Sequence, residues 1–202
     1  MKTVLVIESS ISGKAGKSSQ LVASFLATLP SGVQLDRLDL NAEPLPHLEM
    51  NEIAAWMTPE EERTLQQAAL ARHSDDLIAR FKQADAIVLG VPMYNFGIPS
   101  QLKALLDRVA RAGVTFKYTE QGPVGLLDAK PVVVFATRGG LYQGTAADSQ
   151  TPFLQQFFNF IGLSEQHFIY AEGLNLGEEA ATKALEKAEH RLAEVSRELV
   201  AA

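Results

Sequence analysis

The stretch from Ala86 to Ser100 constrains the fold of this chain more than any other. It begins with a continuous apolar run, Ala86–Val91, and it breaks sharply at Pro92. An apolar strand without polar alternation is expected where both faces of a parallel sheet are covered. A second proline, Pro99, stands where a helix is expected to begin. The loop between the two prolines is therefore expected at the carboxyl end of a buried strand, which is where open α/β sheets bind ligands.

Segments of strand and helix character alternate along the rest of the chain. Strands are expected at Thr3–Glu8, Val33–Leu40, Ala86–Val91, Pro131–Thr137 and His167–Ala171. Helices are expected at about Gln20–Leu29 with Ser18 or Ser19 as N-cap, from Thr58-Pro59 to about Gln83, at Ser100–Ala112, from Thr151 to about Phe160, and from near Glu178. This alternation predicts an α/β fold in which helices cover both faces of a parallel sheet.

The strand order follows from the loops that have to meet. The Ser9–Ser18 loop after the first strand and the Pro92–Pro99 loop form one site only if the first strand lies centrally. That arrangement is the flavodoxin-like, doubly wound order 2-1-3-4-5, with five strands. The other common doubly wound order needs a sixth strand, for which the sequence offers no segment. Residues 1–202 are expected to form a single flavodoxin-like domain.

Composition excludes several classes of function. The 202 residues are 47% hydrophobic and carry a net charge of −6 without a basic run, which argues against a nucleic-acid partner. The chain has no cysteine, so disulfides, thiolate metal sites and cysteine nucleophiles are excluded. Its four histidines show no metal-ligand spacing, so no metal site is expected. No apolar stretch is long enough to span a bilayer and no signal peptide is recognisable, so a cytoplasmic protein is expected.

Two connecting segments are longer than simple turns. Asn41–Met57 is rich in proline and acidic residues and is expected to be a loop with short helical turns. Val114–Leu127 is expected to be irregular, with Thr115–Tyr118 forming part of a short hairpin arm.

The loop after the first strand, Ser9–Ser19, has the composition of a phosphate-binding loop. It combines hydroxyl groups and glycines with Lys17, and it leads into a helix N-terminus, where backbone N–H groups attract anions. It lacks the glycine spacing of a Walker loop and of a dinucleotide-binding loop. An ordinary serine- and glycine-rich turn is the competing interpretation, but the position after a first buried strand favours the phosphate of a mononucleotide.

Two further loops have features of a ring-binding site. The Met93–Gly97 loop carries Tyr94, Asn95 and Phe96, which suit a flat, hydrogen-bonding ligand such as a flavin ring, although the two aromatics would also fit core packing. In the loop Thr137–Gly140, two glycines allow close approach of the backbone to a ring. The Arg138 guanidinium suits either negative charge on a reduced ring or a structural ion pair.

These loops, together with several other motifs, resemble the bacterial FMN-dependent, NADH-using azoreductases. The resemblance runs in order through essentially the whole chain, from Val4-Leu5-Val6 to Ala171-Glu172-Gly173. Its longest motifs are Pro92-Met93-Tyr94-Asn95-Phe96, Val109-Ala110-Arg111-Ala112-Gly113-Val114-Thr115-Phe116, Tyr118-Thr119-Glu120, Arg138-Gly139-Gly140 and Phe160-Ile161-Gly162.

The resemblance implies a bound cofactor, a reaction and a partner. FMN would be held without a covalent bond by Ser10, Gly16, Lys17, Ser18, Met93, Tyr94, Asn95, Phe96, Thr137, Arg138, Gly139 and Gly140. NADH or NADPH would reduce FMN, and the flavin would then reduce an azo compound or a quinone in a ping-pong cycle. The family works as a homodimer with its sites at the subunit interface. An apolar substrate pocket would involve Phe96, Phe116, Tyr118 and Phe160, some of them donated by the second subunit.

No side chain is expected to act as nucleophile or general acid, because a flavin performs the hydride step; Asn95 would assist by a hydrogen bond at the ring edge. Core or dimer packing is the alternative role for Phe116 and Phe160. A flavodoxin-type electron carrier that docks partner proteins is the alternative function, and a sensor or structural protein without flavin is a more distant one. Glu49–Pro59 lies in the family's variable region, so the substrate preference is the property that the resemblance predicts least well. Lys17 stands where many relatives have a different residue.

Overall fold

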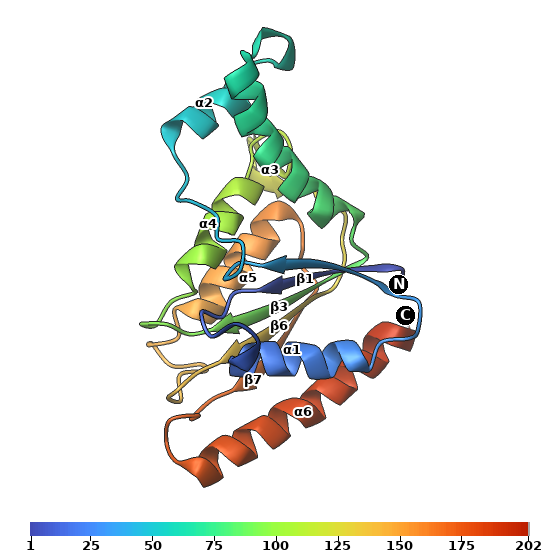
Figure 1. The fold of residues 1–202 in the computed structure, drawn as a ribbon, viewed down its shortest axis with the longest axis vertical. Helices are drawn as coiled ribbons and strands as arrows, with labels where there is room; N and C mark the ends of the chain where they lie inside the picture. The colour runs from blue at the N-terminus through green and yellow to red at the C-terminus, as the bar shows by residue number, and fades with distance from the viewer. Residues whose placement is uncertain (202) are drawn as a thin grey trace.

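A five-stranded parallel sheet runs through the centre of the computed structural model, which describes residues 1–201 (Figure 1). Its order is β2-β1-β3-β6-β7, which is the predicted 2-1-3-4-5 once the separate β4–β5 hairpin is set aside. The sheet strands are β1 (Thr3–Glu8), β2 (Gln34–Asp39), β3 (Ala86–Pro92), β6 (Val132–Thr137) and β7 (Gln166–Ala171). Residue 202, the last of the expected 1–202 domain, lies outside the described residues.

Helices cover both faces of the sheet, as the flavodoxin-like prediction requires. One face carries α1 (Lys17–Ala27) and α6 (Glu178–Ala201), and the other carries α3 (Leu65–Gln83), α4 (Ser100–Val109) and α5 (Gln150–Ile161) (Figure 1). None of the helices within residues 1–201 is long and apolar enough to span a membrane.

Alternate residues of the central strands face the two helical layers. In β1, Val4 and Val6 belong to the core beneath α1 and α6, whereas Leu5 and Ile7 belong to the core beneath α3, α4 and α5. Every residue of β3 is buried, because this strand has a paired strand on each side and a helical layer on each face. The continuous apolar run that predicted a parallel sheet is therefore explained by burial on both faces.

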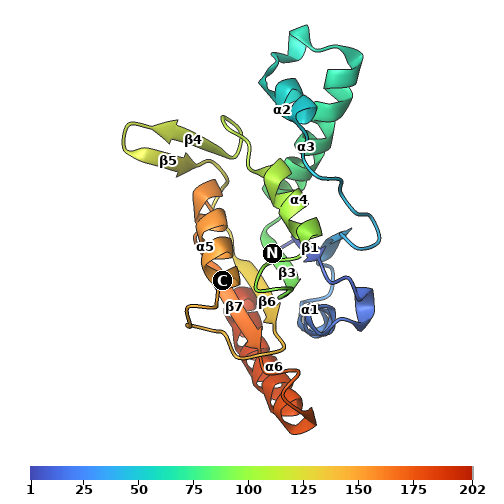
Figure 2. The same ribbon diagram turned by 90° about the vertical axis from the view of Figure 1, so that its left-hand side faces the viewer.

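Two elements extend beyond the sheet at the same end of the molecule. One consists of α2 (Met50–Met57), the short 3-10 turn η2 (Glu60–Glu62) and the start of α3. The other is the antiparallel hairpin of β4 (Phe116–Thr119) and β5 (Gly122–Gly125), which confirms the predicted hairpin arm. Figure 2 shows both extensions reaching upward, away from β7 and α6.

The Thr58-Pro59 helix start was wrong. The chain forms η2 there, and α3 begins only after Thr64, whose hydroxyl accepts from the Gln67 N–H at 3.2 Å while the Gln67 side chain accepts from the Thr64 N–H. This reciprocal capping box satisfies two otherwise unpaired donors at the helix start. The Arg63 side chain donates to the carbonyls of Ala55 and Thr58, which holds the intervening turn in place.

Three other helices also differ from the predictions. The N-cap of α1 is Gly16 rather than Ser18 or Ser19, and α2 forms within the segment expected to be mainly loop. Helix α4 ends at Val109 rather than Ala112, because the buried Thr115 hydroxyl donates to the Val109 carbonyl and accepts from the Arg111 N–H. These side-chain contacts replace the helical hydrogen bonds that would have continued α4.

A buried ion pair fastens α2 to α4. The Arg108 guanidinium is 0% exposed, and its Nε donates to Glu52 Oε2 at 2.9 Å while its Nη2 donates to Glu52 Oε1 at 2.5 Å. Arg108 also donates to the backbone carbonyls of Pro46, His47 and Ala104. Arg108 of α4 therefore holds three residues of the segment after β2, namely Pro46, His47 and Glu52, against the body of the molecule.

Candidate active site

The loops that follow β1, β3 and β6 meet at the carboxyl edge of the sheet, because these three strands are neighbours. They lie together on the left-hand side of Figure 1. The Ser9 hydroxyl donates to the Gly90 carbonyl at 2.7 Å, and the Met93 N–H donates to the Thr137 carbonyl at 2.8 Å. The Ile11 N–H donates to the Tyr94 hydroxyl at 3.2 Å. The three predicted loops thus form one continuous edge.

The first loop closes tightly on the start of α1. A Cβ at Gly16 would stand 2.2 Å from the Ser10 hydroxyl oxygen and 2.8 Å from its Cβ, so only glycine fits here. The first hydrogen bond of α1 runs from the Gln20 N–H to the Gly16 carbonyl at 3.0 Å. The N–H groups of Lys17, Ser18 and Ser19 therefore precede the helical ladder, and such groups bind anions at helix N-termini.

Two hydroxyls in this first turn support an anionic ligand. Ser18 Oγ and Ser19 Oγ are buried, and neither has a hydrogen-bond partner in the part of the chain that the structure describes. A buried polar group without a partner costs about 1–3 kcal/mol, so a ligand that pairs with it is favoured. Lys17 is exposed and places its ammonium group 3.3 Å from Gln20 Oε1, at the surface beside this turn. The residues present fit a phosphate group.

The second loop, which we call the ring loop (Met93–Gly97), contains a strained turn. The Tyr94 N–H donates to the Gly97 carbonyl at 3.1 Å, and the Gly97 N–H donates back to the Tyr94 carbonyl at 3.0 Å. Asn95 and Phe96 between them have φ angles of 48° and 68°. Both lie in the left-handed region, which asparagine adopts more readily than other non-glycine residues but which costs a residue such as phenylalanine about 1–2 kcal/mol. Such strain is common at functional sites, so the turn makes the ring loop a candidate part of the site.

The ring loop offers free groups to a ligand. Phe96 is 55% exposed and Asn95 is exposed as well. The backbone N–H groups of Asn95 and Phe96 have no acceptor among residues 1–201. A flat ligand beside this loop therefore meets two backbone donors, a side-chain amide and an aromatic ring.

The third loop, Thr137–Gly140, lies against the segment after β7. Leu174 N–H donates to the Arg138 carbonyl, Asn175 N–H donates to the Gly139 carbonyl, and Gly173 N–H donates to the Gly140 carbonyl, at 2.9–3.1 Å. A Cβ at Gly139 would stand 2.5 Å from Asn175 Nδ2. The absence of a side chain at Gly139 therefore leaves room for Asn175, and the predicted approach of a ligand ring to the two glycines stays a prediction.

Arg138 makes structural ion pairs, the second of the two roles left open for it. Its side chain is 0% exposed, and it donates to Asp148 at 2.9 Å and to Glu172 at 3.0 Å. The guanidinium carbon also lies 5.0 Å from the centre of the Tyr170 ring. The ion pairs favour the structural role of the Arg138 guanidinium over a direct contact with a reduced ring, because its charge is already engaged by two carboxylates.

Burial and hydrogen bonding together set the ionisation of two groups around Arg138. Burial by itself raises the pKa of Asp148, but the hydrogen bonds from Thr151 and Arg138 together hold that pKa below its usual range. Burial raises the pKa of the Tyr170 hydroxyl, which lies 3.2 Å from the Thr151 hydroxyl. The carboxylate of Asp148 is therefore charged, and Tyr170 is neutral, near neutral pH.

A cavity of about 440 Å³ separates the ring loop from the third loop. A second cavity, of about 650 Å³, lies on the other side of the ring loop, towards Ile11 and Pro99. The two cavities share Met93 and Asn95. Each has the size of a small-molecule site. The residues around the first cavity are Met93, Asn95, Phe96, Gly139, Gly140, Tyr142, Asn175 and Leu176.

The four aromatic residues predicted for the substrate pocket lie in two places. Phe96 packs edge-on against Tyr142, with ring centres 5.6 Å apart. Phe116 packs against Phe160 at 4.1 Å and against Tyr118 at 5.4 Å, next to the β4–β5 hairpin. The single chain therefore does not bring Phe96 together with the other three.

Sequence reasoning missed several residues of the site. Tyr142, Asn175 and Leu176 line the cavity, and Glu172 accepts from the N–H groups of Tyr142 and Gln143 at 2.9 Å. Asn175 and Leu176 follow β7, so the rule that ligands bind at the carboxyl ends of strands would have indicated them. Tyr142 had no comparable signal. No group of three His, Cys, Asp or Glu residues within residues 1–201 is arranged to hold a metal ion.

Comparisons with known proteins agree with this geometry. A protein-family model of the flavodoxin-like fold matches residues 2–195. The FMN-dependent NADH:quinone oxidoreductase of Alteromonas mediterranea is 53% identical over 199 residues, which cover 98% of this chain and 100% of that protein. The FMN-dependent NADH:quinone oxidoreductase of Cellvibrio japonicus is 51% identical over 196 residues, which cover 95% of this chain and 97% of that protein.

A solved structure extends the likeness to three dimensions. The FMN-dependent NADH-azoreductase of Bacillus anthracis, crystallised in complex with FMN, has a TM-score of 0.85 and 25% identity, and the match covers 97% of this chain and 100% of that one. The resemblance to azoreductases noted in the sequence is confirmed. The chain therefore belongs to the flavodoxin-like family of FMN-dependent NADH:quinone oxidoreductases.

Proposed function

We propose that residues 1–202 form one domain that binds FMN at the carboxyl edge of the sheet and uses NADH to reduce quinones and azo compounds. The observation that carries this proposal is that an anion-binding helix start and a cavity of the size of a flavin ring lie along the same edge of the sheet. The unpaired Ser18 and Ser19 hydroxyls stand at one end of the edge, and the cavity of about 440 Å³ lies at the other. When bound, FMN supplies the hydride-transfer chemistry, which no side chain of the protein can provide.

The phosphate and the ring would be held by different loops. Ser10, Gly16, Lys17 and Ser18 would hold the phosphate through hydroxyl groups, backbone N–H groups and one ammonium group. The ring would lie between the ring loop and the Thr137–Gly140 loop, in contact with backbone at Gly139 and Gly140. Arg138 would contribute only through the position of its backbone, because its side chain is engaged elsewhere.

The remaining work of the protein is binding, orientation and exclusion of water. The exposed Phe96 ring offers a surface on which a planar acceptor can stack. The Asn95 amide, which we expect to donate at the ring edge, would fix the ring in its plane. Neither role requires a nucleophile or a general acid.

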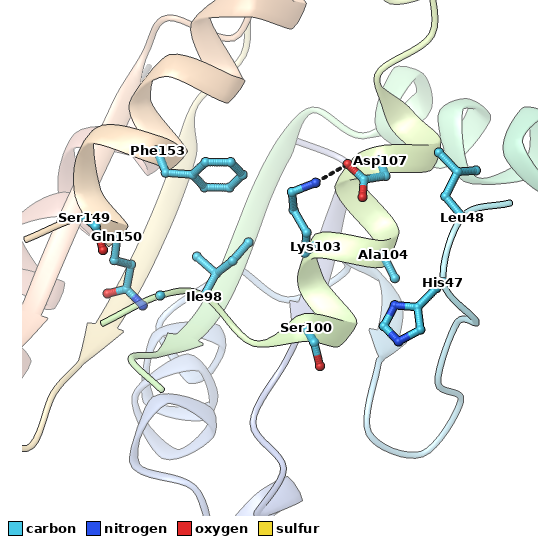
Figure 3. Close-up of a pocket in the computed structure, with 11 residues that line it drawn as sticks. His47, Leu48, Ile98, Ser100, Lys103, Ala104, Asp107, Ser149, Gln150 and Phe153 are labelled. Atoms are coloured by element: carbon cyan, nitrogen blue, oxygen red, sulfur yellow. Dashed lines mark hydrogen bonds and ion pairs between the residues drawn. The ribbon is translucent and has the colours of Figure 1, made fainter. Parts of the chain in front are cut away.

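A homodimer would complete the substrate pocket. Tyr118 on the hairpin is 75% exposed, and Phe153, Phe157 and Phe160 form a half-buried aromatic stripe along α5. A groove of about 460 Å³ lies between α4 and α5, and in Figure 3 Phe153 points across it toward α4. An apolar stripe beside a groove suits a second copy of the chain. Phe116, Tyr118 and Phe160 of one copy would then approach Phe96 of the other.

Purification and titration with FMN test the central proposal. The protein should bind FMN with a 1:1 stoichiometry, and NADH should bleach the flavin absorption without oxygen. Addition of a quinone or an azo dye should restore it. The alternative, an electron carrier, predicts negligible NADH oxidation. A protein that fails to bind added FMN would overturn the proposal.

Separate measurements address the finer points. Asn95→Ala should slow flavin reduction or weaken FMN binding, and unchanged values for both would remove its proposed role. Comparison of NADH with NADPH, and of quinones with azo dyes, ranks the donors and acceptors. Sedimentation of the protein at several concentrations tests the homodimer, and Tyr118→Ser should raise KM for the acceptor if this side chain reaches the partner's site. The cytoplasmic location stays a prediction.

A further inference from the structure

One buried side chain in the first turn of α5 contacts the residues that directly precede the two walls of the ring cavity. Gln150 is 1% exposed. Its Oε1 accepts from Arg138 Nε at 3.2 Å, and its Nε2 donates to the Pro92 carbonyl at 3.1 Å. Pro92 directly precedes the ring loop, and Arg138 directly precedes Gly139. A single amide group therefore links the Pro92 backbone carbonyl, just before the ring loop, to the Arg138 side chain, just before Gly139.

The neighbours of Gln150 strengthen both ends of this bridge. Ser149 Oγ donates to the carbonyl of Phe96, at the corner of the strained turn (Figure 3 shows Ser149 and Gln150 side by side). Asp148 accepts from Arg138 Nη2 at 2.9 Å and from the Thr151 N–H at 3.0 Å. Each residue from Asp148 to Thr151 thus contacts a loop of the site or its Arg138 anchor.

The Arg138 end of the bridge cannot move freely. Its guanidinium is fixed by Asp148, Glu172 and the Thr151 hydroxyl, which accepts from Nη2 at 2.7 Å. Glu172 in turn holds the N–H groups of Tyr142 and Gln143. Because Arg138 and Asp148 are buried, the hydrogen bonds between them are directional and costly to break. Gln150 Oε1 is therefore hydrogen-bonded to an Arg138 side chain whose place is fixed relative to the third loop.

We propose that Gln150 is a positioning residue that sets the separation of the ring loop from the Gly139–Gly140 loop. This inference rests on the proposed FMN site. The side chain needs an acceptor at one end for Arg138 and a donor at the other for the Pro92 carbonyl, and glutamine supplies both. Glutamate keeps the acceptor but directs a second oxygen at the Pro92 carbonyl. Methionine keeps the length and removes both groups.

Three variants test the proposal with FMN as the ligand. Gln150→Met and Gln150→Glu are compared with Gln155→Met, a matched change on the exposed side of α5. The readouts are the Kd for FMN, the absorption spectrum of the bound flavin and its two-electron midpoint potential. Loss of one or two hydrogen bonds should raise the Kd of Gln150→Met about fivefold to tenfold. Gln155→Met should match the wild type in all three.

Gln150→Glu separates the two ends of the bridge. If the donor to Pro92 positions the ring loop, Gln150→Glu should weaken FMN binding at least as much as Gln150→Met and should shift the spectrum and the potential. Wild-type values of Kd, spectrum and potential in Gln150→Glu would overturn the inference, and this variant decides if Gln150→Met does not fold. A wild-type protein that binds no FMN would overturn the proposed function instead, so the two failures are distinguishable.

Discussion

Replacement of Glu52 by leucine should cost the protein much of its stability. Glu52 is 5% exposed and provides the only carboxylate on the fully buried Arg108 guanidinium within the described residues. Removal of one partner of a buried ion pair typically costs about 3–5 kcal/mol, because the other charge is left uncompensated. Three backbone carbonyls would still accept from Arg108 in Glu52→Leu, so a cost near the lower end, about 3 kcal/mol, is expected.

The reverse change should cost more. In Arg108→Met the Glu52 carboxylate would keep only the Glu49 N–H as a donor, at 3.4 Å, and the Pro46 and His47 carbonyls would lose their donor. We expect about 5 kcal/mol for this variant. The double variant Glu52→Leu/Arg108→Met leaves no unpaired charge, so its cost should fall well short of the sum of the two single costs.

Urea unfolding followed by two signals is the assay. Trp56, the only tryptophan of the chain, belongs to α2, so its fluorescence reports on the fastened segment, whereas far-ultraviolet circular dichroism reports on all helices. In Glu52→Leu the fluorescence transition should occur at lower urea than the dichroism transition, because α2 loses its link to α4. Glu61→Leu, at an exposed position in η2, is the control. A loss below about 1 kcal/mol in Glu52→Leu, or strictly additive costs in the double variant, would refute the reasoning.

Three further predictions concern the site and the opposite edge of the sheet. Gly16→Ala should raise the Kd for FMN at least about tenfold in a fluorescence titration, since its Cβ would stand 2.2 Å from Ser10 Oγ; an unchanged Kd contradicts the phosphate assignment. Lys130, which precedes β6, donates from Nζ to three carbonyls at the end of α3. Lys130→Met should therefore lower the free energy of unfolding by about 1–3 kcal/mol while leaving the Kd for FMN unchanged. The pKa of Asp148 is lower in the folded protein than in the unfolded chain, so around pH 4 the unfolded chain binds more protons. The contribution of the Asp148 carboxylate to stability is therefore complete above about pH 4 and is lost as the pH falls below it. The urea midpoint should therefore fall less steeply below pH 4 in Asp148→Asn than in the wild type.

The sheet was predictable because its central strands are buried on both faces. No polar residue interrupts Ala86–Val91 or Val132–Ala136, and all these positions are buried in the structure. Such runs are incompatible with a sheet that exposes one face, so the parallel class follows from the residues themselves. The central place of β1 followed from the requirement that two ligand loops meet.

Helix starts were less predictable because several local signals compete. Thr58-Pro59 followed by glutamates and Thr64 followed by Gln67 are both acceptable N-termini by local rules. The choice between them depends on contacts distant in sequence, such as those of Arg63 with Ala55 and Thr58. The sequence pattern does not reveal these contacts, so the predicted helix began too early.

The roles of individual site residues depended on the same kind of distant contact. The role of Arg138 was undecided in the sequence because its partners, Asp148 and Glu172, lie ten and 34 positions later. The loops themselves were located correctly, because they follow strands. What the strands do not specify is which side chains lock the loops to one another.

The strained turn of the ring loop shows why this distinction matters for function. Nothing in the residue types of Asn95 and Phe96 requires a left-handed backbone, and an isolated loop would relax to a less costly conformation. In the folded chain, the Tyr94–Gly97 hydrogen bonds and the Ser149 contact with the Phe96 carbonyl hold the turn. The conformation that presents Phe96 to a ligand is thus maintained by α5, a helix that follows the neighbouring strand. A chain with the same ring loop but without polar groups at positions 149 and 150 should therefore bind FMN more weakly, even though every residue that contacts the ring is retained.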